Sequence, residues 1–288
     1  MKLVIDKICK DFTNNRGQAL SVLQDIELTV NEEEFVALVG PSGCGKSTLL
    51  NIASGLLQPT SGTVKFTEVE EGYEPRMSIV FQETGLFPWR NVHDNIAFGL
   101  ETAGMPATQR EERIEHYIEL VGLKGFEKSF PHQLSGGMRQ RVGIARALIM
   151  NPKLIIADEC ISALDVSIQA QVVNLMKDIQ QETGTAYLFI AHDLSMVKYI
   201  SDRIGVLHLG HLLETGTTEE IFADPIHPYT RSLLSAIPLP NPVVEKRRVA
   251  ETYDYATSGI DYSKGTSHLV SGSHYVKCTD EEFAKWCK

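Results

Sequence analysis

The sequence predicts an α/β fold in which helices cover both faces of a mostly parallel β-sheet. Short, strongly apolar runs predict strands buried on both faces, as parallel strands are; they are Phe35–Val39, Lys153–Ala157 and Ala186–Ala191. Segments with helical periodicity alternate with these runs, which is the pattern of such folds. Ligands of these sheets bind beyond the carboxyl ends of the strands, so we expect the functional site in the loops that follow the apolar runs.

The remaining elements are expected in a regular order along the chain. Short strands occupy residues 3–39, among them the alternating segment Ile26–Val30. A helix through Leu50 and Ile52 follows and ends near Gly55. Further expected elements are strands at Thr63–Phe66 and Met77–Phe81, helices within 83–130, a helix at 136–150 ended by Asn151-Pro152, a helix at 166–182 and a hairpin across 202–214.

The composition changes after Pro225. Five prolines fall close together and polar, tyrosine-rich residues follow. Residues 226–288 carry 8 basic and 7 acidic side chains, a net charge of +1, in a chain whose total is 27 − 37 = −10. We therefore divide the chain into a core of 1–82 and 131–225, a helical insertion of 83–130 and an appended C-terminal region of 226–288.

Charge and cysteine content exclude several classes of protein. A net charge of −10 argues against a nucleic-acid binder, which usually carries a basic face. The five cysteines are odd in number and lack metal-site spacing, so neither a disulfide framework nor a zinc site is expected. No apolar run approaches the roughly 20 residues that cross a bilayer. Any link to a membrane is therefore expected to come through a partner protein.

A glycine-rich loop follows the first buried strand. Gly40-Pro41-Ser42-Gly43-Cys44-Gly45-Lys46-Ser47 fits the pattern G-x-x-x-x-G-K-[ST] and opens a helix, the context that distinguishes a phosphate-binding loop from an ordinary glycine turn. Backbone N–H groups and the helix N-terminus are expected to hold phosphate. Lys46 would reach the β- and γ-phosphates, Ser47 would bind Mg²⁺, and Thr48 would bond the α-phosphate.

Two carboxylates end the second buried strand. Asp158 is expected to hold Mg²⁺, and Glu159 to polarise the water that attacks the γ-phosphate, since phosphoryl transfer needs an oriented nucleophile as well as charge neutralisation. Without the glycine loop, such a pair would more often be a solvated loop or a helix cap.

A second anion cradle is expected at a helix start, where Ser135, Gly136 and Gly137 precede Met138. The alternative is an ordinary N-cap. One nucleotide does not need two cradles in one chain. Head-to-tail pairing of two chains would use both, with ATP between the glycine loop of one and the cradle of the other.

With these motifs in this order, residues 1 to about 245 resemble the ATP-binding subunits of ABC (ATP-binding cassette) transporters. The resemblance implies a cassette that binds ATP and Mg²⁺ and hydrolyses ATP, with Gln82 touching Mg²⁺ and water, Asp165 at the dimer interface and His192 at the γ-phosphate. Phe12 would stack on adenine, or else be an ordinary core residue. Tandem-cassette translation factors, repair cassettes with coiled coils and phosphate-loop kinases fit less well.

Two cysteines stand close to these motifs. Cys160 replaces the proline that is usual after the catalytic glutamate in this family, which predicts a looser turn and weakened hydrolysis. Cys44, beside Lys46 and a helix N-terminus, is expected to have a lowered pKa and a reactive thiol.

The two halves of the chain resemble different importers. Segments 41–62 and 81–99, including Phe87 and Trp89, are similar to ATPases of taurine, sulfonate and nitrate importers. From about residue 156 onward, and above all in Asp224–Thr230, the chain resembles oligopeptide and dipeptide importer ATPases. The resemblance implies peptide import, with the sulfonate type as the alternative and a non-transport cassette as a remote one. Implied partners are membrane permeases, a second ATPase subunit and, indirectly, an extracytoplasmic solute-binding protein, and the implied location is the cytoplasmic face of the membrane.

Overall fold

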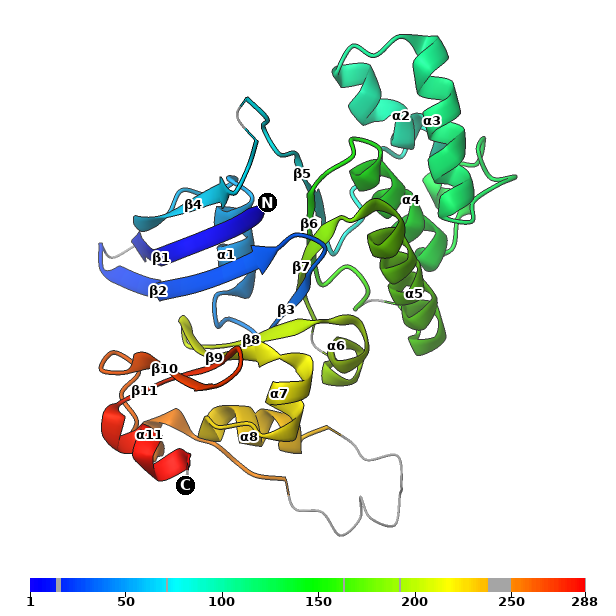
Figure 1. Ribbon diagram of the computed structural model, residues 1–288. Coiled ribbons are helices and arrows are strands. Elements are labelled where there is room, and N and C mark those ends of the chain that lie inside the picture. Colours follow the sequence, from blue (N-terminus) through cyan, green and yellow to red (C-terminus); the bar gives the residue numbers. More distant parts are fainter. Residues whose placement is uncertain (14–16, 71, 163, 192, 238–249, 288) are drawn as a thin grey trace, which may run out of the picture.

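The chain forms two β-sheets with helices between and around them (Figure 1). This computed structural model describes residues 1–13, 17–70, 72–162, 164–191, 193–237 and 250–287. The smaller sheet is antiparallel and has the strand order β2-β1-β4. Its strands are β1 (Lys2–Thr13), β2 (Ala19–Asn31) and β4 (Ser61–Thr67). Its strands correspond to short strands predicted within residues 3–39 and at Thr63–Phe66.

The larger sheet has eight strands in the order β10-β11-β9-β8-β3-β7-β6-β5. Along this order, the pairs between β10 and β8 are antiparallel, and the pairs between β8 and β5 are parallel. The bounds are β3 Phe35–Val39, β5 Met77–Val80, β6 Leu154–Asp158, β7 Ala186–Ile190, β8 Arg203–His208, β9 His211–Thr217, β10 Thr266–Ser271 and β11 His274–Cys278. The predicted α/β class with a mostly parallel core is confirmed.

Two hydrophobic cores lie on opposite faces of the larger sheet. Alternate side chains of a strand point to opposite faces, and β3 shows this directly. Its Val36 and Leu38 pack into one core with α1 (Lys46–Ala53) and the smaller sheet. Its Phe35, Ala37 and Val39 pack into the other core, which contains buried residues of α4 (Gly136–Leu148) and α5 (Val166–Thr183).

The predicted helices of segment 83–130 are α2 (Val92–Thr102) and α3 (Ala107–Leu120), and they pack beside α4 (Figure 1). Ile114, Ile118 and Val121 stand at helical spacing along this segment, and all three are buried. A short 3-10 helix, η1 (Pro131–Gln133), leads from this segment into α4. Two helices that sequence reasoning missed, α6 (Leu194–Ile200) and α7 (Thr218–Ala223), flank β8 and β9. None of the helices among the described residues is both long and apolar enough to cross a membrane.

The sequence suggests that the C-terminal region is an appendage beyond the catalytic fold. In the structure, this region instead adds strands to the larger sheet. Its helices are α8 (Pro228–Ser235), α10 (Tyr255–Ser258) and α11 (Asp280–Trp286), and its hairpin β10–β11 pairs with β9 and extends the large sheet. Val276 and Cys278 point inward and are buried, whereas Tyr275 points outward. The hairpin escapes notice in the sequence because most of its alternating residues are polar.

Candidate functional site

The predicted phosphate loop connects β3 to α1 in a conformation that needs glycine. Gly40, Gly43 and Gly45 have φ of +154°, +81° and +107°, a region that side chains disfavour. A Cβ on Gly40 would stand 2.0 Å from the carbonyl oxygen of Leu207. One on Gly45 would stand 2.7 Å from Cδ2 of Leu23. The loop is therefore shaped by its backbone, and its outer residues, Pro41 to Gly43, are exposed to solvent.

The side chain of Lys46 lies inside this loop. It is 5% exposed, and its Nζ donates hydrogen bonds to the carbonyl oxygens of Gly40 at 2.8 Å and Pro41 at 3.0 Å. The positive charge therefore sits at the N-terminus of α1, where backbone N–H groups also favour anions. This is an arrangement suited to holding phosphate groups.

The end of β6 comes close to the start of α1. The Ser47 hydroxyl donates to Oδ1 of Asp158 at 3.4 Å, joining residues 111 positions apart in sequence. A hydroxyl and a carboxylate are the oxygen ligands that suit Mg²⁺, which is commonly held by one or two protein groups together with substrate phosphates. The donor set therefore fits the metal predicted here.

Glu159 follows β6 in a strained backbone conformation. Its φ is +45°, uncommon for a residue with a side chain and typical of functional sites. Its backbone N–H donates to the carbonyl oxygen of Ile190 at the end of β7, at 3.2 Å. The Ser162 hydroxyl donates to the Glu159 carbonyl oxygen at 2.9 Å, and Nε2 of Gln82 donates to the Ser162 hydroxyl oxygen at 3.4 Å. The structure thus brings Gln82 to the loop that carries Glu159.

The second anion cradle is at the start of α4, on the opposite face of the sheet from α1. Ser135 is the N-cap, and its hydroxyl accepts a hydrogen bond from the N–H of Met138 at 3.3 Å. A Cβ on Gly137 would stand 2.5 Å from Cγ2 of Ile168 in the first turn of α5, whose N-cap is Asp165. Close packing at Gly137 therefore ties the cradle to the Asp165 segment.

Three further residues were predicted for the nucleotide site, and the structure describes two of them, Phe12 and Thr48. Phe12, on β1, is 39% exposed and lies 5.1 Å (ring centroid) from Nζ of Lys10, so the alternative of a core phenylalanine is wrong. Thr48, in the first turn of α1, is half-buried. His192 lies outside the described residues.

The expectation of a reactive Cys44 is wrong. Its side chain is 2% exposed, and burial raises the pKa of the thiol, outweighing the lowering effect of Lys46. Cys160 is also buried, and burial raises its pKa to about 12. Both groups therefore remain protonated thiols at neutral pH, because a thiol buried in apolar surroundings resists ionisation.

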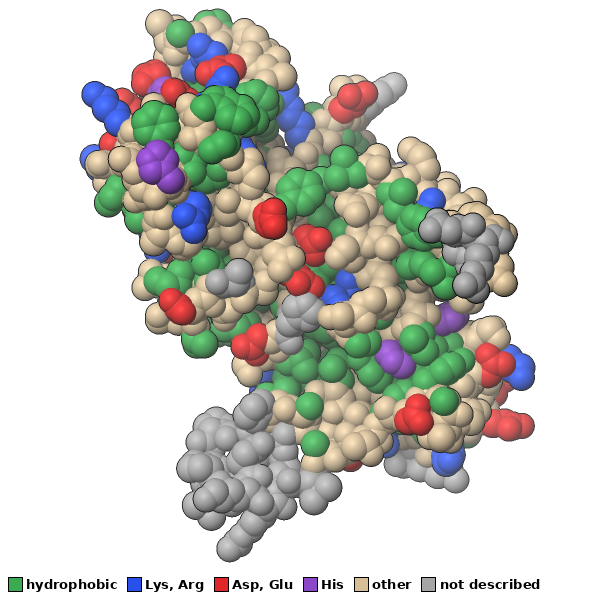
Figure 2. All heavy atoms as spheres, turned by 180° about the vertical axis from the view of Figure 1, so that it is seen from behind, with side chains coloured by type: hydrophobic (Ala, Val, Ile, Leu, Met, Phe, Trp, Pro, Cys, Tyr) green, Lys and Arg blue, Asp and Glu red, His purple; other side chains and the backbone are tan. Residues whose placement is uncertain are grey.

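An aromatic patch, defined here as Phe87, Trp89 and Phe98, lies beside the Gln82 segment. The Phe87 ring centroid is 4.7 Å from that of Phe98 and 5.6 Å from that of Trp89. Trp89 is 72% exposed. The helical region, at the upper left in Figure 2, presents hydrophobic side chains next to basic ones.

Sequence reasoning identified Phe87 and Trp89 but missed the basic residues around them. The guanidinium groups of Arg90 and Arg146 lie 5.7 and 5.9 Å from the Phe87 ring. Arg146, on α4, also donates to the carbonyl oxygens of Thr84 and Gly85 at 2.8 and 2.9 Å. Arg146 thus connects the chain just after Gln82 to the helix that begins at the second cradle.

Two families match the chain. The family described as ABC transporter matches residues 23–162, and the family described as oligopeptide/dipeptide transporter, C-terminal region, matches residues 213–259. The oligopeptide transport ATP-binding protein OppF of Bacillus subtilis is 46% identical, over 98% of this chain and 97% of that protein. The dipeptide transport ATP-binding protein DppF of Lactococcus lactis is 43% identical, over 98% and 96%.

Solved structures agree in fold. A dimeric ATP-binding cassette bound to ADP and Pi has a TM-score of 0.66 at 29% identity, covering 75% of this chain and 98% of that one. The protein cbiO1 of Clostridium perfringens, part of the ABC transporter complex cbiONQ, has a TM-score of 0.70 at 25% identity, covering 85% of this chain and 97% of that one.

Proposed function

The chain belongs to the family of ABC transporter ATP-binding proteins and is an ATP hydrolase of that type, and we propose that it powers the import of oligopeptides or dipeptides. The peptide-type relatives align with 98% of the chain, so their similarity extends through residues 41–99, which also resemble sulfonate-type ATPases. The match of residues 213–259 to the oligopeptide/dipeptide C-terminal region supports the same substrate class.

The observation that carries the catalytic proposal is the contact between Ser47 and Asp158. It places a hydroxyl from the phosphate loop and a carboxylate from β6 at one point, next to the ammonium of Lys46. We infer that Ser47 and Asp158 hold Mg²⁺, with Gln82 as a further ligand, while Lys46 and the loop N–H groups hold the phosphates. The metal would neutralise charge on the transferred phosphoryl group.

Glu159 is the proposed general base. Its strained φ and the hydrogen bonds to its backbone from Ser162 and to Ile190 fix the start of its side chain one residue beyond Asp158. From there its carboxylate would orient and polarise the attacking water, and His192 would contact the γ-phosphate. Gln82 is hydrogen-bonded to Ser162 and would transmit conformational changes of this loop to the adjacent aromatic patch.

The two cradles support the proposal that the chain works as a dimer. They start helices on opposite faces of the sheet, which suits a head-to-tail dimer in which the phosphate loop of one subunit faces Ser135 to Gly137 of its mate. Asp165 would lie at that interface, and Phe12 would stack on adenine. The mate is either a second copy or a related ATPase.

The proposed membrane partner is a permease that docks on the aromatic patch. Exposed aromatic side chains of this kind dominate interface energies, and Arg146 joins the patch to the segment after Gln82. Docking there would hold the protein at the cytoplasmic face of the membrane. An extracytoplasmic solute-binding protein would deliver the peptide to the permease.

The test is size-exclusion chromatography of purified protein with Mg-ATP. Glu159→Gln keeps the phosphate loop intact and removes the base, so it should bind ATP, stop hydrolysis and elute as a dimer. Glu112→Gln, at an exposed position on α3, is the matched control and should hydrolyse ATP normally. A Glu159→Gln protein that stays monomeric and hydrolyses ATP at the normal rate would refute the role of Glu159.

A further inference from the structure

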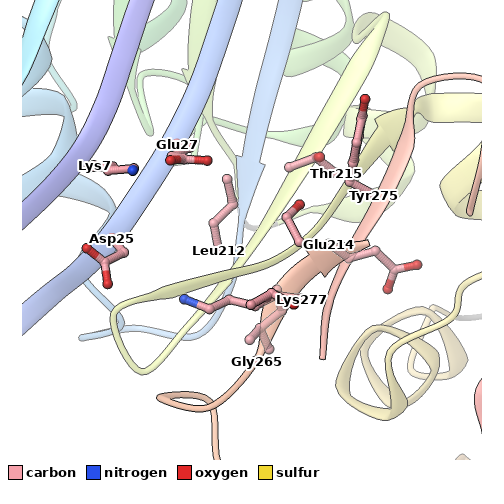
Figure 3. Close-up of a pocket in the computed structure, with 12 residues that line it drawn as sticks. Lys7, Asp25, Glu27, Leu212, Glu214, Thr215, Gly265, Tyr275 and Lys277 are labelled. Atoms are coloured by element: carbon pink, nitrogen blue, oxygen red, sulfur yellow. The ribbon is translucent and has the colours of Figure 1, made fainter. Parts of the chain in front are cut away.

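A cleft of about 340 Å³ separates the smaller sheet from the C-terminal hairpin (Figure 3). Its walls come from β1 and β2 on one side and from β9, β10 and β11 on the other. None of its lining residues belongs to the phosphate loop, to the second cradle or to the aromatic patch. The cleft is therefore separate from the sites described above.

Charged side chains of both signs line this cleft. Asp25 and Glu27 come from β2, Lys7 from β1 and Lys277 from β11. A fifth charged residue of the lining, Glu214 of β9, is already bonded to the buried His274. Figure 3 shows the ammonium of Lys277 directed towards the wall that carries Asp25. Within the described ranges, no direct ion pair joins any of these four side chains to another. Each wall thus presents charge to the space between them.

The contact that Lys277 does make is with an uncharged group. Its Nζ is 3.3 Å from Nδ1 of His211. Burial, with a contribution from Lys277, lowers the pKa of His211 to about 4, so the imidazole is neutral at pH 7 and serves as an acceptor. The ammonium is therefore positioned by a neutral group, although burial lowers its pKa and the charges of Asp25 and Glu27 partly offset that effect.

Two of the four residues are held in a strained backbone. Lys7 has φ of +48° and Asp25 has φ of +47°, and both lie at register shifts of the β1–β2 ladder. Such bulges re-aim side chains, and a positive φ is uncommon in residues other than glycine. The Cys9 thiol fixes Asp25 further: it accepts from the Asp25 N–H at 3.3 Å and donates to Oδ1 at 3.5 Å. Both strained residues face the same cleft.

We propose that this cleft binds a small zwitterion, an amino acid or a dipeptide with free termini. The ligand ammonium would lie against Asp25 and Glu27, and its carboxylate against Lys277 and Lys7. Leu212 supplies an apolar surface for a ligand side chain. The volume is near the lower end of the range for small-molecule pockets, about 300–1,000 Å³, which suits a ligand of this size. A ligand held this way would bridge β2 and the C-terminal hairpin.

The experiment measures binding to the full chain without nucleotide or permease, so its result is independent of the proposed transport function. The probes are L-alanine, L-alanyl-L-alanine and the dipeptide blocked at both ends by acetyl and amide groups. Isothermal titration calorimetry, supported by saturation-transfer NMR, should show saturable binding of a free zwitterion and none of the blocked dipeptide. Which of the two free probes binds more tightly identifies the source of the ligand.

Charge-removing variants locate the site. Lys277→Gln and Glu27→Gln should each weaken binding about three- to tenfold, the effect of losing one partly exposed charge pair. Lys264→Gln, a largely exposed lysine of the same C-terminal region that does not line the cleft, should leave affinity unchanged. Glu27 is exposed on its strand, so its variant tests the site even if Lys277→Gln disturbs folding. Absence of saturable binding, equal binding of the blocked dipeptide, or unchanged affinity in Glu27→Gln would each overturn the proposal.

Discussion

The carboxylate of Glu214, on β9, lies 2.7 Å from Nε2 of His274, on β11, with both side chains fully enclosed. The same carboxylate accepts the backbone N–H groups of Ile226 at 2.7 Å and His227 at 3.0 Å. One buried side chain therefore joins the core sheet to the start of the C-terminal region and to its hairpin. That region is held by polar contacts that apolar packing alone would not specify.

Removing this carboxylate should destabilise the fold. Glu214→Ala leaves His274 and two backbone N–H groups buried without their partner, a loss of about 3–5 kcal/mol in the free energy of unfolding. Urea denaturation followed by circular dichroism measures it. Glu112→Gln, an exposed control, should change the free energy of unfolding by less than about 0.5 kcal/mol. Equal stability of Glu214→Ala and wild type would mean that the C-terminal region is held in some other way.

The rate at which each cysteine thiol is labelled should depend on how exposed its side chain is to solvent. At pH 7, maleimide should modify the exposed Cys287 well before the buried Cys44, as peptide mapping by mass spectrometry would show. Because the pKa of Cys44 is raised, its thiolate fraction and its labelling rate should increase as the pH is raised from 7 to 9. Fast labelling of Cys44 at pH 7, blocked by Mg-ATP, would instead support the reactive thiol suggested by sequence alone.

The parallel core and the phosphate loop could be predicted because their signals are local. Apolar runs such as Phe35–Val39 mark strands buried on both faces, and the glycine spacing fixes the loop. Two helices that were not predicted, α7 and α11, also had a local signal. Thr217 with Glu220, and Thr279 with Glu282, form capping boxes at the starts of α7 and α11.

Other features depend on contacts between distant segments, and no pattern along the chain reveals them. The hairpin β10–β11 is polar and finds its place through the buried contact of His274 with Glu214. The burial of Cys44 depends on the surrounding fold, whereas Lys46 is close in sequence, so sequence reasoning gave the charge too much weight. The strained φ of Glu159 is likewise set by its neighbours in space.

Close packing at Gly137 should be essential for the second cradle. Gly137→Ala would place a Cβ 2.5 Å from Cγ2 of Ile168, so α4 or α5 must shift, at a cost of about 1–3 kcal/mol. The shift moves the Ser135 to Gly137 cradle relative to Asp165, and ATP hydrolysis should fall while ATP binding to the monomer persists. A fluorescent ATP analogue and a phosphate-release assay measure the two quantities.

The double variant Gly137→Ala with Ile168→Ala provides the control for this prediction. It removes the Cγ2 atom that the new methyl group would strike, so it should recover much of the lost hydrolysis relative to Gly137→Ala alone. No recovery in the double variant would show that the glycine is required for a reason other than its contact with Ile168.

Trp89 should govern coupling to the permease without supporting the fold. Its side chain is 72% exposed and its ring contacts that of Phe87, so Trp89→Ala should leave the melting temperature and basal ATPase activity nearly unchanged. Loss of a central aromatic anchor typically costs about 2 kcal/mol or more, or about 30-fold in affinity for the partner. Phe126→Ala, at another exposed aromatic of the helical region, is the control and should bind the permease normally.

The measurement is a pull-down with peptide-type and sulfonate-type permeases in detergent, together with permease-stimulated ATPase activity. If the protein binds only the peptide-type permease and Trp89→Ala abolishes that binding, both the docking surface and the peptide assignment are supported. Normal permease binding by Trp89→Ala would contradict the docking surface, and retention only by the sulfonate-type permease would contradict the proposed substrate class.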